Sequence, residues 1–171
     1  MFNIKGYITL FFIILLLNTS VYSADTKSSS SGAKSDGRQD QSFLKVSSGN
    51  YIKGYNAFKQ AKKYDKKGKT DKAIKRFNDA IDFLTLSNEE NPNEPDILNY
   101  LGFSFKKIED FIMAEIYYEQ GLAIDPQHID INKNLGKLYF ETKRFKKAKE
   151  RLKILKSCTC EAYEELKNLI K

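Results

Sequence analysis

The sequence predicts an all-α protein, an α-solenoid of about three helical hairpins closed by a C-terminal capping helix. Two observations predict this class. Apolar residues between Pro95 and Pro126 recur at the three- and four-residue steps of a helix. The same order of leucine, glycine, aromatic residue and alanine then returns 34 residues later. A fixed period of that length is typical of stacked repeats, whose units cannot bury their apolar faces alone.

The clearest copy of the repeat begins at Pro95. Leu98, Leu101 and Phe105 lie at i, i+3 and i+7, so they form one stripe along a helix. Gly102 has no Cβ, and it therefore lets a second helix cross closely at that point. A helical hairpin is the unit that this spacing predicts.

The second copy follows when Gly102 is shifted by 34 residues onto Gly136. The copy that begins at Pro95 also has Ala114, Tyr118, Gly121 and Pro126 at the repeat positions. The copy around Gly136 has Leu135, Tyr139, Ala148, Leu152 and Leu155. This pattern resembles the tetratricopeptide repeat (TPR) family over roughly residues 54–160. The resemblance implies a right-handed superhelix with a concave wall formed by the first helices of the hairpins. The chain is also similar to small exported bacterial TPR-domain proteins.

An earlier and more degenerate repeat begins near Gly54, with Gly68 in the turn between its two helices. Its terminating proline is expected at residue 85, but the match is Pro92, which leaves seven extra residues after Ala80. Seven residues make about two helical turns. We therefore expect a longer second helix that keeps the same face toward its neighbours.

The predicted TPR domain covers residues 51–171. Its repeats are 54–94, 95–128 and 129–160, followed by a capping helix over 161–171. The expected helices of the last two repeats are Pro95–Lys107, Phe111–Ile124, Ile129–Thr142 and Phe145–Lys156. Asn132 stands where a bulky residue is usual, which is a departure from the family pattern.

The N-terminal residues 1–23 read as an export signal, with Lys5 before an apolar run of eleven residues, Tyr7–Leu17. This run is shorter than the ~20 residues that a spanning helix needs. We expect cleavage near Ser23, no stable membrane span in the mature chain, and a periplasmic or secreted protein. Residues 24–50 are rich in serine and are expected to be a disordered tether.

The charge balance is basic, with 29 Lys and Arg against 22 Asp and Glu and a net charge of +7. The lysines alternate with acidic residues along the helices, which is typical of a solvated surface. A nucleic-acid groove would need a basic stripe with interleaved aromatic residues, so no nucleic-acid partner is expected. A weak preference for acidic partners or anionic membrane surfaces remains open.

The resemblance to TPR proteins implies a protein or peptide partner in the concave groove. The family's inward positions correspond here to Tyr55, Phe58, Lys62, Asn99, Phe103, Lys106, Lys133, Lys137 and Phe140. Lysine with aromatic residues suits a peptide that bears carboxylates. The alternative is that Phe58 and Phe103 only pack between hairpins. The positions of the chaperone-binding carboxylate clamp hold Phe58, Lys62, Tyr100, Asp130 and Asn134 here, which do not match that clamp.

The two cysteines, Cys158 and Cys160, are spaced C-x-C before the last helix. Three interpretations stay open: a disulfide, two free thiols, or a redox or Cu(I) site. His128 has a position that suits a helix start, and no motif gathers an acid, a base and a nucleophile. The sequence therefore predicts a non-enzymatic adaptor of the cell envelope without cofactor or metal, with a thiol-redox or Cu(I)-handling protein as the alternative and the oligomeric state open.

Overall fold

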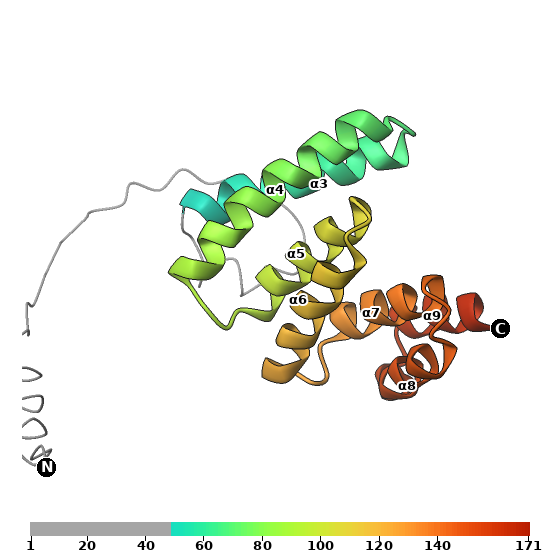
Figure 1. The fold of residues 1–171 in the computed structure, drawn as a ribbon. Helices are drawn as coiled ribbons and strands as arrows, with labels where there is room; N and C mark the ends of the chain where they lie inside the picture. Colours follow the sequence, from blue (N-terminus) through green and yellow to red (C-terminus); the bar gives the residue numbers. More distant parts are fainter. Residues whose placement is uncertain (1–48) are drawn as a thin grey trace, which may run out of the picture. The chain divides into compact units, whose positions relative to one another are not determined.

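The computed structural model describes residues 49–171, which form seven α-helices, one short 3₁₀ turn and, within that range, no strand (Figure 1). The α-helices are α3 (Gly49–Lys66), α4 (Thr70–Glu90), α5 (Pro95–Lys107), α6 (Phe111–Ile124), α7 (Ile129–Glu141), α8 (Phe145–Leu155) and α9 (Glu161–Ile170). The pairs α3–α4, α5–α6 and α7–α8 are hairpins, and α9 packs on α7 and α8. The all-α solenoid class is thus confirmed. The expected signal and residues 24–48 of the expected tether lie outside the described residues, whereas residues 49 and 50, expected in the tether, belong to α3.

The helices of the last two hairpins follow from local sequence signals. Helices α5 and α6 have the expected bounds, while α7 and α8 end one residue earlier than expected. Pro95 opens α5 at a position where its missing N–H is not needed, and the Asp110 carboxylate accepts the backbone N–H of Met113 and caps α6. Glu109 and Lys143 occupy the turns with φ of 66° and 61°. These residues take the left-handed conformation that Gly68, with φ of 65°, adopts in the first turn.

The first hairpin is lengthened in both of its helices. Helix α4 has 21 residues and α6 has 14, so the seven extra residues do extend the helix. However, α3 begins at Gly49 and not near Gly54, because the added turns of α4 need a partner. Tyr51 is buried there, and the Asn50 amide donates to the Glu90 carboxylate at 2.6 Å.

The helix crossings lie at glycines. A Cβ at Gly102 would lie 2.7 Å from the ring of Tyr118 in α6, and one at Gly136 would lie 2.5 Å from Leu166 in α9. Leu166 is fully buried against α7 and α8. Helix α9 therefore covers the end of the array, as a capping helix must.

The unexpected Asn132 is buried in α7 and fully hydrogen-bonded. Its amide nitrogen donates to the backbone carbonyls of Pro126 and His128, both at 3.0 Å, and its oxygen accepts from Arg151 at 3.3 Å. The side chain thus closes the turn before α7 and holds α8 against it. Among residues 49–171 no helix combines the length and the apolar character that crossing a bilayer requires.

Candidate partner-binding surface

The first helices of the three hairpins, α3, α5 and α7, lie side by side and share one face. We define this A-helix face by the nine residues that the sequence singled out, from Tyr55 to Phe140. At its α3 end the face is aromatic. The ring of Tyr100 lies 5.2 Å from Tyr55 and 4.9 Å from Phe58, and Phe103 meets Phe58 edge to face at 5.3 Å. These contacts fix α5 against α3 and place flat aromatic surface along the face.

Toward α7 and α9 the A-helix face becomes polar and internally paired. Asn134 donates to Asn99 at 3.0 Å. The Lys106 ammonium lies 2.6 Å from the Glu141 carboxylate, and the corresponding distance from Lys137 to Glu165 is 2.7 Å. Hydrogen bonding and the charge of Lys137 hold the pKa of Glu165 below its usual range, although burial opposes them. These lysines therefore join neighbouring helices.

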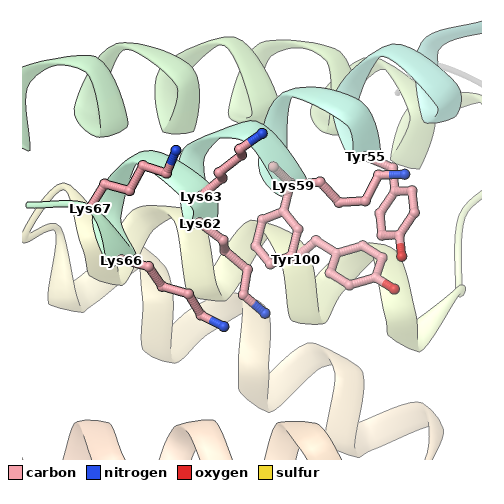
Figure 2. A pocket seen from close by; sticks show the side chains of 8 residues that line it. Tyr55, Lys59, Lys62, Lys63, Lys66, Lys67 and Tyr100 are labelled. Carbon is pink, nitrogen blue, oxygen red and sulfur yellow. The ribbon is translucent and has the colours of Figure 1, made fainter. Parts of the chain in front are cut away.

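A hollow of about 580 Å³ opens on α3, at the aromatic end of the face (Figure 2). We call it the α3 hollow. Its lining contains five lysines, two tyrosines and one phenylalanine, with no acidic side chain: Lys59, Lys62, Lys63, Lys66, Lys67, Tyr55, Tyr100 and Phe58. The Lys59 ammonium lies over the Tyr55 ring at 4.6 Å. The site thus combines positive charge with aromatic surface.

Lys62 occupies the inner side of the α3 hollow. Its ammonium lies 5.4 Å from the ring of Phe58 and 5.5 Å from that of Phe103. Burial, together with the charges of Lys66 and Lys133, lowers the pKa of Lys62, although Asp130 and Glu165 oppose the shift. An incoming carboxylate would relieve this crowding of positive charge.

The nine sequence-predicted residues differ in how much surface they offer to a partner. Phe58 is only 5% exposed and Asn99 is also buried, so each has little surface left for a partner. Tyr55 and Lys62 line the hollow, and Phe103 is half-buried beneath Lys62. Lys133 pairs with Asp130 at 2.8 Å, and Phe140 packs edge to face against Phe145.

Sequence reasoning missed most of the lysines of the α3 hollow. Lys59, Lys63, Lys66 and Lys67 recur at steps of three and four residues, which places them along connected faces of one helix. From this spacing the sequence alone could have predicted a basic side on this helix. Tyr100 could not be found in this way, because its role depends on how α5 packs against α3.

The cysteines lie away from this surface, at the junction of α8 and α9. Cys158 and Cys160 form a disulfide, and Thr159 between them has a φ of 46°. β-Branched residues rarely take that conformation. Among the described residues, no three His, Cys, Asp or Glu side chains are grouped so that they could hold a metal ion.

In a comparison with known protein families, the tetratricopeptide repeat matches residues 110–169. A curated relative is the uncharacterized protein ycf37 of Guillardia theta, 32% identical over 87 residues. The aligned segment covers 50% of this chain and 48% of that protein. The match thus spans about half the length of this relative.

Solved structures of similar fold are TPR domains. The first TPR domain of Spaghetti (RPAP3), bound to the HSP90 peptide SRMEEVD, has a TM-score of 0.53 and 20% identity, and the match covers 70% of this chain and 94% of that one. The Sgt2 TPR domain of Aspergillus fumigatus has a TM-score of 0.51 and 21% identity, and the match covers 64% of this chain and 76% of that one. The Arabidopsis OM64 TPR domain has a TM-score of 0.50 and 15% identity, and the match covers 71% of this chain and 97% of that one.

Proposed function

Because this chain carries tetratricopeptide repeats, we propose that it is a non-enzymatic adaptor of the cell envelope that binds a partner protein or peptide on its A-helix face. The observation that carries the proposal is the α3 hollow, with five lysines beside aromatic rings and no acid in its lining. TPR domains typically mediate protein–protein interaction, and the RPAP3 domain of similar fold is bound to a peptide.

The chemistry of the α3 hollow favours a segment that carries carboxylates and at least one flat or apolar side chain. Elsewhere on the A-helix face the lysines are already paired with acids: Lys106 with Glu141, Lys133 with Asp130 and Lys137 with Glu165. On this face the unpaired positive charge is therefore concentrated on α3. Carboxylates would contact the lysines, while an apolar side chain would cover the rings of Tyr55 and Tyr100.

The adaptor is proposed to act after export. Lys5 and the apolar run Tyr7–Leu17 support this, together with the small residues around Ser23. Mass spectrometry of the protein from fractionated cells tests it, and the expected mature N-terminus is Ala24. A chain that is recovered intact from the cytosol would contradict export and leave the binding proposal standing.

The binding test uses an array of immobilised peptides that differ in the number of carboxylates and in the presence of one aromatic residue. Wild-type protein is compared with Lys59→Glu/Lys63→Glu, which reverses two charges of the hollow. The matched control is Lys149→Glu/Lys153→Glu, which makes the same change on α8. We expect the hollow variant to lose binding to acidic peptides at least tenfold and the control to retain it.

Two outcomes would contradict the proposal. Equal loss in both variants would mean that only the net charge matters. Retained binding in the Lys59→Glu/Lys63→Glu variant would place the ligand elsewhere. To identify the natural partner, a photoreactive residue is placed at position 100 in intact cells, with one at position 86 on α4 as the control site. Adducts formed at position 100 and lost with the hollow variant are the expected result.

The disulfide supports a second candidate function, thiol exchange at Cys158 and Cys160. In that case the repeats dock a client whose dithiol is oxidised while this disulfide is reduced, so two electrons and two protons pass to the cysteines. Replacing both cysteines with serine separates the candidates. An adaptor keeps its partner after the change, whereas a redox protein loses its function.

A further inference from the structure

A cluster of exposed apolar side chains lies at the starts of α6 and α8, away from the α3 hollow. Ile112 is 74% exposed, Phe145 49%, Ile116 41% and Phe111 38%. Ile112 and Ile116 are one helical turn apart and share a face. Helix α6 has apolar residues on all its sides and no Lys or Arg, although a helix at a protein surface ordinarily turns a polar face to water.

The first turns of the two helices are held side by side. Arg144 Nη1 lies 2.8 and 2.5 Å from the two carboxylate oxygens of Glu115, and the Lys147 ammonium lies 3.5 Å from Oε1 of the same group. The starts of α6 and α8 therefore form one region of the surface. We call it the α6/α8 patch, and it comprises Phe111, Ile112, Ile116, Phe145, Lys143, Lys146 and Lys149.

The α8 side of the patch is strongly basic. Lys146, Lys149 and Lys153 are exposed and follow one another at steps of three and four residues, so they line one side of the helix. Glu150 is the only acidic residue in α8. Within residues 49–171, Lys143, Lys146 and Lys149 form no ion pair. A shallow hollow in the surface is lined by residues 143–147.

We propose that the α6/α8 patch docks on the surface of an anionic lipid bilayer. Ile112, Ile116 and the phenylalanines enter the headgroup region, while the lysines contact the lipid phosphates. Protruding apolar side chains on one helix beside a lysine-rich neighbouring helix are the chemistry by which a peripheral protein lies on such a membrane. This surface shares no residue with the α3 hollow and does not depend on a peptide partner, although its Phe145 packs against Phe140 of the A-helix face.

Charge and shape favour a bilayer over other occupants. In a two-fold contact between copies built on this patch, the same lysines would face one another, and the chain already carries a net charge of +7. Ile112 is 74% exposed and so projects from the surface, where a peptide would bury little of it. A nucleic acid would contact the lysines, but it would gain nothing from aliphatic side chains that project from the surface.

The test uses residues 39–171, because they contain the whole described core. This choice also removes the apolar run Tyr7–Leu17, which would itself bind lipid. Circular dichroism first establishes that each variant is helical and melts cooperatively. Co-sedimentation is then measured with vesicles of equal phosphatidylglycerol and phosphatidylcholine, and with vesicles of phosphatidylcholine alone. We expect binding to the first and at least tenfold weaker binding to the second.

Two matched pairs of variants locate the contact. Ile112→Ser/Ile116→Ser is expected to weaken binding at least fivefold. The control Ile52→Ser/Ile74→Ser changes two isoleucines of the first hairpin that are as exposed as Ile116, and it is expected to leave binding unchanged. Lys146→Glu/Lys149→Glu is expected to weaken it more than tenfold, since each lysine near an anionic surface contributes about fivefold. The control Lys72→Glu/Lys75→Glu makes the same charge change on α4.

The proposal is overturned if phosphatidylcholine vesicles bind equally well, or if both charge-reversal pairs weaken binding to the same extent. It is also overturned if the isoleucine variant binds lipid like the wild type. Loss of lipid binding in the presence of a short DNA duplex, with wild-type DNA affinity in the isoleucine variant, would assign the patch to a nucleic acid.

Discussion

Gly102 in α5 lies directly against the ring of Tyr118 in α6. A Cβ at position 102 would lie 2.7 Å from Cδ1 and from Cε1 of that ring. Tyr118 is fully buried, so its ring cannot turn aside into solvent. The absence of one methyl group thus sets how closely the helices of the second hairpin approach.

Gly102→Ala is expected to destabilise the protein. Forcing a methyl group into a packed crossing costs about 1–3 kcal/mol, and the better helix propensity of alanine returns about 1 kcal/mol of it. We expect a net loss of about 1 kcal/mol in the free energy of unfolding, measured by urea denaturation. Gly49→Ala is the control, because nothing lies within 4 Å of its Cβ position. A Gly102→Ala variant as stable as this control would contradict the packing.

Two buried tyrosines should respond differently to removal of the hydroxyl group. The Tyr118 hydroxyl has no hydrogen-bond partner among the described residues, whereas that of Tyr139 donates to Glu119 at 3.1 Å. We expect Tyr118→Phe to leave the free energy of unfolding unchanged or to raise it, since an unpaired buried hydroxyl is costly. Tyr139→Phe should lower it by about 1 kcal/mol. Thermal melts of the two variants provide the comparison, and equal losses would show that the Tyr118 hydroxyl is paired.

The sequence was sufficient for those parts of the fold that depend on local spacing. The helices of the second and third hairpins, and the glycines at their crossings, follow from a period that each segment carries within itself. The start of α3 at Gly49 does not follow from this period. Tyr51 is buried only because α4 has two added turns opposite it, and this requires knowledge of how the two helices pair.

The candidate site was less predictable than the fold. Tyr55 and Lys62 were found from the repeat register, but the acids that neutralise Lys106 and Lys137 lie 35 and 28 residues away. Pairs at such separations depend on the packing between helices. The same holds for Asn132. A polar residue at this core position is explained by its hydrogen bonds to the backbone carbonyls of Pro126 and His128, which the sequence pattern does not predict.

The pair formed by Glu115 and Arg144 should contribute stability that is lost in acid. Burial alone would raise the pKa of Glu115, but the hydrogen bonds and charge of Arg144 hold it below its usual range, with help from Lys147. The contribution is therefore present above the unfolded-state pKa and is lost as the pH falls through the folded-state value. We expect Glu115→Gln to cost about 1 kcal/mol at pH 7, because the pair is partly solvent-screened.

The cost of Glu115→Gln should shrink as the pH falls from about 5 to about 3. Urea denaturation at several pH values gives this dependence. Glu150→Gln on α8 is the control, since Glu150 is exposed and forms no ion pair within residues 49–171. A cost for Glu115→Gln that stays constant down to pH 3 would mean that packing, and not charge, is what the substitution removes.

His128 links the second and third hairpins and should titrate above its ordinary range. Its Nε2 donates to Asp96 in α5 at 3.1 Å, while Nδ1 accepts the backbone N–H of Ile131 at 3.3 Å. Burial alone would lower the pKa of His128, but the hydrogen bond and charge of Asp96, with Asp125 and Asp130 nearby, raise it. Protonation of Nδ1 would break its long hydrogen bond from the N–H of Ile131. The attraction of the three carboxylates for the charged ring is greater than this loss, so the pKa rises.

NMR measures this pKa directly, because His128 is the only histidine in the chain. We expect a value above the ordinary 6.5, and a lower one in Asp96→Asn, where the charge is removed and an acceptor oxygen remains. Since the folded-state pKa exceeds the unfolded-state value, the stabilisation is fully present below the latter and is lost as the pH rises through the former. The stability advantage of the wild type over Asp96→Asn should therefore be larger at pH 5.5 than at pH 8.5. A His128 pKa at or below 6.5 would show that the N–H of Ile131 outweighs the three acids.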